Sequence, residues 1–227
     1  MVCFPEFFKQ FPVFSDLTNS ELNEVAEISN HRIFPKGTNI FIEGEERKAV
    51  YFILSGLVKV YKVNEKGQEQ VISFLHSDEM FPHVGFFDET PYPATAVTIN
   101  QVDLLSIPIE EFEILMLRKP EISIKVMRVM GKKLLEMQNR IQSITTQSVF
   151  SRIISTLLRF SKELGEQQED GTIIIRMPMT NTDLASLIGV TRESVNRTLN
   201  RLKKEGIVTH NRKEISILDE KKLIDYT

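Results

Sequence analysis

The side chains of this 227-residue chain whose types and spacing best suit chemistry lie on one short helical pattern near the C-terminus. Arginine can form two parallel hydrogen bonds with a guanine edge, and glutamate can accept one from the cytosine amino group. Glu193 and Arg197 stand four residues apart and so share a helix face, which Arg192 can join. The simpler interpretation of Glu193 and Arg197 alone is a surface ion pair. With their flanks included, we predict a face that reads DNA bases, made of Arg192, Glu193, Asn196 and Arg197.

Two short helices around a tight turn, predicted over residues 180–202, must position this face. Thr180 and Asp183 have the spacing of a capping box at the start of the first helix. Gly189 ends that helix, because a residue without Cβ accepts the left-handed conformation of a tight exit. Thr191 can cap the second helix, whose apolar residues recur at helical spacing. The pattern predicts a helix-turn-helix whose second helix enters the DNA major groove.

The flanks of this motif are basic. Between residues 191 and 213 there are seven Lys or Arg and two Asp or Glu, in a chain whose formal net charge is −3. Such a patch is what phosphate contacts require. Segments Ile207–His210 and Glu214–Leu218 predict a hairpin with a basic tip, which makes the motif a winged helix-turn-helix. The predicted contacts to the DNA backbone are Thr180, Thr182, Thr191, Ser194, Arg201, Lys203, Arg212 and Lys213.

The segment with Arg192, Glu193 and Arg197 resembles the DNA-binding motif of the CRP/FNR family of bacterial transcription regulators, whose reading helix carries R-E-x-x-x-R. The resemblance implies transcription regulation by a homodimer that binds double-stranded DNA at a palindrome with TGTGA-like half-sites. It also makes RNA polymerase a further candidate partner. Asn196 departs from the small residue that CRP has at this position.

Composition fits a globular protein, with 41% hydrophobic and 26% charged residues. We find no apolar run long enough to cross a bilayer and no secretory signal, so we expect no membrane association. The one cysteine, Cys3, excludes an intrachain disulfide and favours a cytoplasmic location. No phosphate-binding glycine loop, zinc-spaced Cys/His set or nucleophile elbow is present, so we expect no enzyme.

The N-terminal half changes from helical to strand-like patterns. Residues 4–30 predict helices, with a capping box from Thr18 to Glu21, and residues 31–108 predict short strands separated by glycine turns. The pattern K-G-x-x-I-F-x-x-G-E that begins at Lys36 is similar to the cyclic-nucleotide-binding-type barrel of the same family. We predict an α+β protein with an N-terminal cyclic-nucleotide-binding-type β jelly-roll barrel, a long dimerisation helix and a C-terminal winged helix-turn-helix. The predicted domains are 1–120, 121–147 and 148–227.

A long helical pattern over about residues 121–145 has apolar residues at steps of three and four, as in a coiled-coil seam. The alternative is an ordinary helix packed on its own barrel. We predict a parallel homodimer, because one helix-turn-helix reads only one half-site. Residues 143–148 have little apolar content and are the predicted hinge. The predicted interface residues are Val126, Met130, Leu134, Met137, Ile141 and Ile144.

The resemblance fails at the effector site. Family members that bind cyclic AMP carry Gly and Glu for the ribose, and Arg and Ser for the cyclic phosphate. Here Pro82 and His83 stand at the first pair of positions, and Pro93 and Ala94 at the second. On the long helix, Met137 and Gln138 replace the Thr and Ser expected to read adenine. Because a buried phosphate without a cation is costly, we predict that cyclic AMP does not bind appreciably.

Other effectors remain as alternatives, although we expect no cofactor. One cysteine cannot ligate the iron–sulfur cluster of the oxygen-sensing branch. A haem-based gas sensor would use His83, although a lone histidine is more often a packed or surface residue. Phe81, Phe86, Phe87, Tyr92 and Met137 either hold an apolar ligand or, as we expect, fill the space as core. A redox role for Cys3, or a barrel that regulates a partner enzyme, are the remaining alternatives; kinase-type regulatory modules lack the winged helix-turn-helix.

Overall fold

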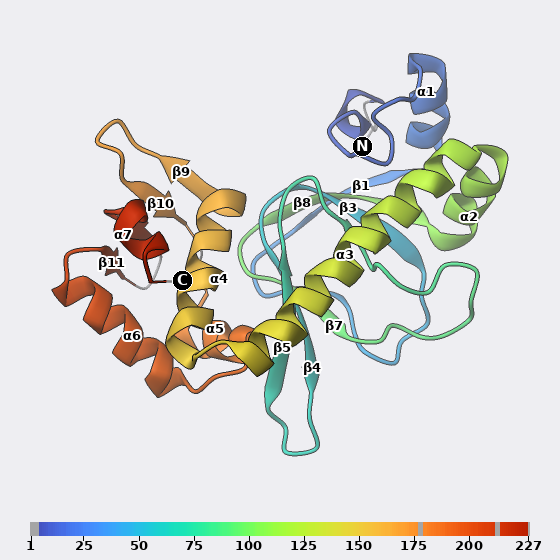
Figure 1. Ribbon diagram of the computed structural model, residues 1–227. Coiled ribbons are helices and arrows are strands. Elements are labelled where there is room, and N and C mark those ends of the chain that lie inside the picture. Colours follow the sequence, from blue (N-terminus) through green and yellow to red (C-terminus); the bar gives the residue numbers. More distant parts are fainter. Residues whose placement is uncertain (1–4, 177–178, 212–213, 227) are drawn as a thin grey trace. The chain divides into compact units, whose positions relative to one another are not determined.

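The computed structural model describes residues 5–176, 179–211 and 214–226 (Figure 1). The chain divides into two compact units, Met1–Glu136 and Met137–Thr227. The boundary falls inside one long helix, α3 (Pro120–Thr146), so this helix contributes to both units. The domain boundaries expected at residues 120 and 147 therefore stay a prediction. Among the described helices, none has the length and apolar character needed to cross a bilayer.

Two antiparallel four-stranded sheets form the first unit, which confirms the predicted barrel. One sheet has the strand order β1-β8-β3-β6, and the other has the order β2-β7-β4-β5. The switch of neighbours between distant parts of the chain is typical of a jelly roll. The strands are β1 (Asn30–Phe34), β2 (Asn39–Phe41), β3 (Ala49–Ser55), β4 (Val58–Val63), β5 (Glu69–Leu75), β6 (Met80–Phe81), β7 (Thr95–Thr98) and β8 (Val102–Pro108).

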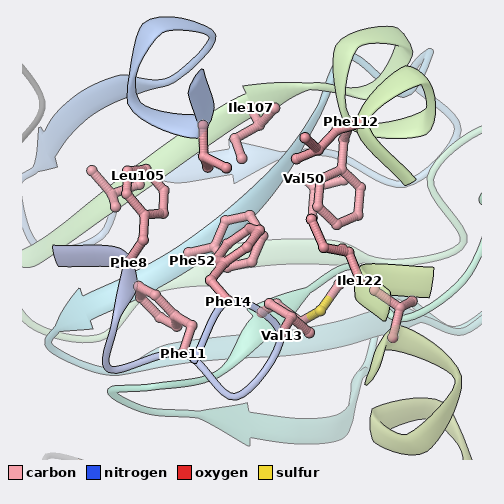
Figure 2. Packing of buried hydrophobic residues seen from close by; sticks show 14 of the residues in the cluster. Phe8, Phe11, Val13, Phe14, Val50, Phe52, Leu105, Ile107, Phe112 and Ile122 are labelled. Atoms are coloured by element: carbon pink, nitrogen blue, oxygen red, sulfur yellow. The ribbon is translucent and has the colours of Figure 1, made fainter. Parts of the chain in front are cut away.

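Helical segments close one face of this barrel. They are η1 (Pro5–Phe8), α1 (Asn19–Glu27), α2 (Ile109–Arg118) and the first half of α3. The predicted capping box at the start of α1 is present, since the Glu21 amide donates to the Thr18 hydroxyl and the Thr18 amide to the Glu21 carboxylate. Phe14 packs against Phe52 of β3 and Phe112 of α2, with ring centroids 5.1 and 6.4 Å apart (Figure 2). Aromatic packing thus fastens the N-terminal segment to the barrel.

The apolar residues of α3 divide between two surroundings. Val126 is only 4% exposed and lies in the aromatic core of the first unit, so its placement in the dimer seam is corrected: its surface is already covered within one chain. Met130 is partly buried against the same core. Met127, which the sequence reasoning passed over, is 61% exposed. The exposed predicted seam residues are Leu134, Met137, Ile141 and Ile144.

The predicted hinge is shorter than residues 143–148. Helix α3 continues through Thr146, and its last turn is closed by hydrogen bonds from the Thr145 and Thr146 hydroxyls to the Gln142 carbonyl. Helix α4 (Val149–Leu164) begins immediately after Ser148, whose hydroxyl accepts from the Ser151 amide. Threonine hydroxyls satisfied by the preceding turn allow the helix to extend through this polar stretch.

The second unit packs helices on a small sheet of order β11-β12-β10-β9. The strands β11 (Val208–His210) and β12 (Ile215–Ile217) pair antiparallel, as the predicted hairpin requires. The sequence reasoning missed β9 (Gly165–Gln167) and the short C-terminal helix α7 (Glu220–Ile224). The remaining elements are α4, β10 (Ile173–Ile175), α5 (Asn181–Ile188) and α6 (Arg192–Lys204).

Candidate nucleic-acid interface and effector region

Helices α5 and α6 form the predicted helix-turn-helix, and the predicted caps define both helix starts. The Asp183 amide donates to the Thr180 hydroxyl over 3.1 Å, and the Thr180 amide donates to the Asp183 carboxylate over 3.0 Å. Gly189 has φ of 75°, and its amide donates to the Ala185 carbonyl. A left-handed residue at this point turns the chain sharply enough for α6 to start at Arg192.

Helix α6 buries one face and leaves the other open. Its buried side chains are Val195, Thr198, Leu199 and Leu202, whereas Arg192, Glu193 and Arg197 are exposed. Glu193 and Arg197 form no ion pair with any described residue, so the surface-pair interpretation receives no support from the structure. Three hydrogen-bonding side chains of suitable type are therefore unengaged at the start of the helix.

Asn196 differs from the other three predicted base-reading residues. Its side-chain oxygen accepts a hydrogen bond of 2.5 Å from the Asn181 amide group at the start of α5. This bond joins the two helices of the motif and leaves Asn196 half-buried. The sequence reasoning missed Asn181, and its signal was its position beside the cap residue Thr180. Asn196 thus helps to hold the reading helix in place.

The predicted backbone contacts have different surroundings. The Thr180 hydroxyl is bonded to the Asp183 carboxylate (2.7 Å), and the Thr191 and Ser194 hydroxyls are bonded to each other (3.0 Å), so all three are engaged in caps. Thr182 and Lys203 are exposed. Arg212 and Lys213 lie outside the described residues.

Arg201 has a structural role that the sequence did not reveal. Its guanidinium is bonded to Glu205 (2.9 Å) and lies over the Phe150 ring, 4.5 Å from the centroid. Tyr226 packs against Phe150 and donates its hydroxyl hydrogen to Glu205. Arg201 therefore fastens the C-terminal segment to α4 and α6, and it remains a phosphate contact only as a prediction.

The end of α3 is joined to the motif by a further arginine. The Arg140 guanidinium donates to the Leu187 carbonyl in the last turn of α5, where carbonyls lack helical partners. Burial, together with nearby Arg159, lowers the pKa of Arg140. No sequence signal identified this contact, because the two residues lie 47 positions apart.

Aromatic side chains stack in the interior of the barrel, beside a cleft of about 260 Å³ that Phe41, Tyr51 and Tyr92 help to line. Phe41 and Tyr92 stack with ring centroids 3.8 Å apart, and Tyr51 and Phe81 stack at 5.2 Å. All four rings are buried, and the Tyr92 hydroxyl accepts from the Lys48 amide over 3.1 Å. Burial raises the pKa of Tyr51 well above its ordinary value. As expected, Phe81 and Tyr92 act as core, whereas Phe86 packs beside Phe112 and Phe87 is exposed.

The predicted effector residues divide between the two units. Pro82 and Ala94 are buried, whereas Pro93 is exposed. The assignment of these residues to an effector pocket stays a prediction. Met137 and Gln138 belong to the second unit and are both exposed.

A cation missing from the sequence reasoning lies at this loop. Arg47 is buried, and its guanidinium donates to the Val84 carbonyl over 3.3 Å and to the carbonyl and carboxylate of Asp88. Gly85 has φ of 91°, and a Cβ at this position would stand 0.9 Å from an Arg47 nitrogen. The expectation of a site without a cation is therefore corrected. The two terminal nitrogens of Arg47 bind this loop, whereas its buried Nε has no hydrogen-bond partner among the described residues.

His83 lies on a cleft beside Glu79 and Lys133. Burial, with a smaller effect of the nearby Lys133 charge, lowers the pKa of His83 to about 4, so the ring is neutral at pH 7. These surroundings do not suit a haem ligand, because a charged Lys–Glu pair flanks the ring and stacked aromatics occupy part of the barrel interior. Within the described residues, no group of three or more His, Cys, Asp or Glu could hold a metal ion.

Two family models match the chain, one on each side of α3. Residues 31–119 match the model of a cyclic nucleotide-binding domain, and residues 151–226 match that of a Crp-like helix-turn-helix domain. The anaerobic regulatory protein of Bacillus subtilis is 30% identical over 205 residues, which cover 89% of this chain and 86% of that protein. The CRP-like cAMP-activated global transcriptional regulator of Mycobacterium tuberculosis is 29% identical over 190 residues, or 84% of either chain.

Solved structures share this fold. FixK2 from Bradyrhizobium japonicum superposes with a TM-score of 0.78 at 19% identity, covering 88% of this chain and 97% of the other. A CooA mutant from Carboxydothermus hydrogenoformans superposes with a TM-score of 0.72 at 22% identity, covering 89% of each chain. At such identities the likeness extends to the arrangement of strands and helices.

Proposed function

The chain belongs to the CRP/FNR family of transcription regulators, and we propose that it is a homodimer that reads a TGTGA-like palindrome without cyclic AMP. The observation that carries the proposal is the open face of α6. Arg192, Glu193 and Arg197 are exposed, form no ion pair with the residues that the structure describes, and stand near the start of a helix whose opposite face is buried. In a major groove, the two arginines would each contact a guanine and Glu193 a cytosine.

Dimerisation is supported by the exposed stripe on α3. Met127, Leu134 and Ile141 repeat every seven residues, and Met130, Met137 and Ile144 repeat between them. This spacing of three and four is that of a coiled-coil seam. An unpaired apolar stripe of this length would be costly in water, whereas two parallel copies would cover it.

Independence of cyclic AMP is supported by the barrel interior. Four aromatic rings stack there. Arg47 already donates hydrogen bonds to the Val84 carbonyl and to the carbonyl and carboxylate of Asp88. The Mycobacterium relative is a cAMP-activated regulator, so this chain would differ from it in the effector. Regulation would follow from DNA binding, with RNA polymerase as the next partner, rather than from catalysis, and would take place in the cytoplasm.

Fluorescence anisotropy tests this function. The labelled duplex carries TGTGA and TCACA separated by about six base pairs, which places the half-sites about one helical turn apart. We expect tight binding without cyclic AMP, and much weaker binding to a scrambled duplex of the same composition. Binding that requires cyclic AMP would refute effector independence. Equal binding to both duplexes would refute sequence-specific reading at this palindrome.

A further inference from the structure

A cleft of about 420 Å³ opens on the first unit, away from the barrel interior. Its walls come from three separate segments: residues 11–16, residues 78–83 and residues 125–133 of α3. Apolar side chains contribute part of the wall, including Val13, Met80 and Val129. The volume is within the range of small-molecule sites, which combine an apolar wall with a few polar groups.

The charged residues around this cleft are unequally engaged. Lys125 is paired with Asp16 over 2.7 Å, and Lys133 with Glu79 over 2.6 Å. Arg128 and Lys132 also line the cleft, are exposed, and form no ion pair with the described residues. One helical turn separates them on α3, so they can face one ligand group together. Asp78 also lines the cleft as an exposed carboxylate without an ion pair among the described residues. The four Lys and Arg of the lining therefore exceed its three Asp and Glu by one positive charge.

His83 adds a neutral polar group to the same cleft. It makes no hydrogen bond to any described residue, and its ring is neutral at pH 7. A neutral imidazole carries one donor and one acceptor nitrogen. Half-buried imidazole nitrogens without partners are available to a ligand, and they would favour one that carries a polar group beside its anionic one.

We propose that this cleft binds a small organic anion, with its carboxylate or phosphate on Arg128 and Lys132 and its apolar body against Val13, Met80 and Val129. Charge-assisted hydrogen bonds to the two cations hold the anionic end. Simple inorganic anions should bind more weakly than organic ones, because they bury no hydrophobic surface against the apolar wall. The inference stands independently of DNA reading.

The proposed dimer leaves this cleft open. With Met127 and Leu134 at heptad position a, Arg128 falls at b, Val129 at c, and Lys132 at f. Positions b, c and f point away from a two-stranded seam. Each chain of the dimer would therefore keep its own site, and ligand could enter without dissociation of the two chains.

Anilinonaphthalene sulfonate is a suitable probe, because it joins an aromatic body to one anionic group. We expect the full-length protein to show one class of fluorescent site. In Arg128→Gln/Lys132→Gln, affinity should fall about tenfold or more, as expected for two lost charge-assisted contacts. The matched control, Lys36→Gln/Lys66→Gln, removes the same charge from exposed turns and should bind as the unaltered chain does.

Two further measurements locate the site and define its ligand. Ser15 is exposed on the cleft wall, so Ser15→Trp should abolish probe binding by filling the space. The neutral N-phenylnaphthylamine should bind the unaltered chain and Arg128→Gln/Lys132→Gln equally. Displacement of the sulfonate by phenylacetate indicates a carboxylate ligand, and displacement by phenyl phosphate a phosphate. Unchanged sulfonate affinity in both cleft variants, or an equal loss in the control variant, would overturn the proposal.

Discussion

The exposed face of α6 and the interior of the barrel use their side chains in opposite ways. On α6, Arg192, Glu193 and Arg197 form no ion pair within the described part of the chain, and a buried apolar face and an N-terminal cap hold the helix in place. In the barrel, Phe41, Tyr51, Phe81 and Tyr92 stack on one another. The polar side chains on α6 are open to a ligand, whereas the aromatic rings of the barrel already pack against each other.

This contrast shows how a protein of this fold can keep its DNA-binding surface while its effector site changes. A helix that reads DNA depends on a few exposed side chains and on local caps, so the pattern survives large changes elsewhere. An effector pocket depends on space, so aromatic rings that take up part of the space can change which ligand fits even when the strands remain. The fold therefore constrains the geometry of the helix-turn-helix more closely than it constrains the identity of a ligand.

The largest expected effect comes from disrupting the proposed dimer seam on α3. Binding to both half-sites of a palindrome requires this seam, whereas folding of the barrel does not. Leu134→Glu/Ile141→Glu places two like charges in the apolar contact, at a cost of several kcal/mol. We expect a monomer by analytical ultracentrifugation and a loss of specific DNA affinity of more than about 100-fold. Asn139→Glu/Gln142→Glu adds the same charge at exposed positions and should stay dimeric. A dimeric seam variant would refute this interface.

The next effect sharpens the barrel side. Gly85→Ala should lower the free energy of unfolding by roughly 2–4 kcal/mol, because it combines an unfavourable left-handed residue with displacement of buried Arg47. Gly67→Ala is the control, since Gly67 has φ of 73° and nothing within 4 Å of an added Cβ. It should cost about 1–2 kcal/mol. Urea unfolding measures both, and equal losses would show that Arg47 contributes nothing.

A smaller effect tests the open face of α6. The natural chain should discriminate between the palindrome and a duplex in which the contacted guanine is replaced. Arg197→Gln should lower that difference in binding free energy by roughly 1–3 kcal/mol. Lys204→Gln, in the last turn of the same helix, is the control. It should weaken binding to both duplexes alike, because it would contact only phosphate. Anisotropy titrations at one salt concentration separate the two, and unchanged discrimination in Arg197→Gln would argue against base reading.

The smallest effect concerns His83. Its pKa is lowered from the ordinary 6.5 to about 4, so the folded state favours the neutral ring. Between these values the unfolded chain binds more protons, and stability therefore rises with pH and is fully present above pH 6.5. Between pH 7 and pH 5 the natural chain should lose roughly 1–2 kcal/mol more than His83→Gln. Identical pH profiles in chemical denaturation would show that the ring is hydrated.

Local signals predicted much of the reader. The caps at Thr180 and Thr191 and the left-handed Gly189 follow from residues within one turn of each helix end, and all three are confirmed. The Asn181–Asn196 bond was missed because both amides are common in solvent-exposed turns and helices. Its geometry becomes visible only when the two helices are packed.

Contacts between distant residues set the limit elsewhere. Val126 and Met127 are adjacent and both apolar, so helical spacing alone did not decide which side chain faces the barrel and which faces solvent. Packing against Phe112 and its neighbours decides it. Arg47 meets the Val84–Asp88 loop from about forty residues away, and no spacing rule connects a lone arginine with a loop glycine. The strand β9 and helix α7 are too short for a period to appear.

The packing of Arg47 over Gly85 also constrains how this lineage can change. A side chain at position 85 would occupy the volume that the Arg47 guanidinium now fills, so the arginine would have to move. Substitutions at the two positions should therefore be epistatic, because a smaller residue at position 47 would lower the cost of a side chain at position 85.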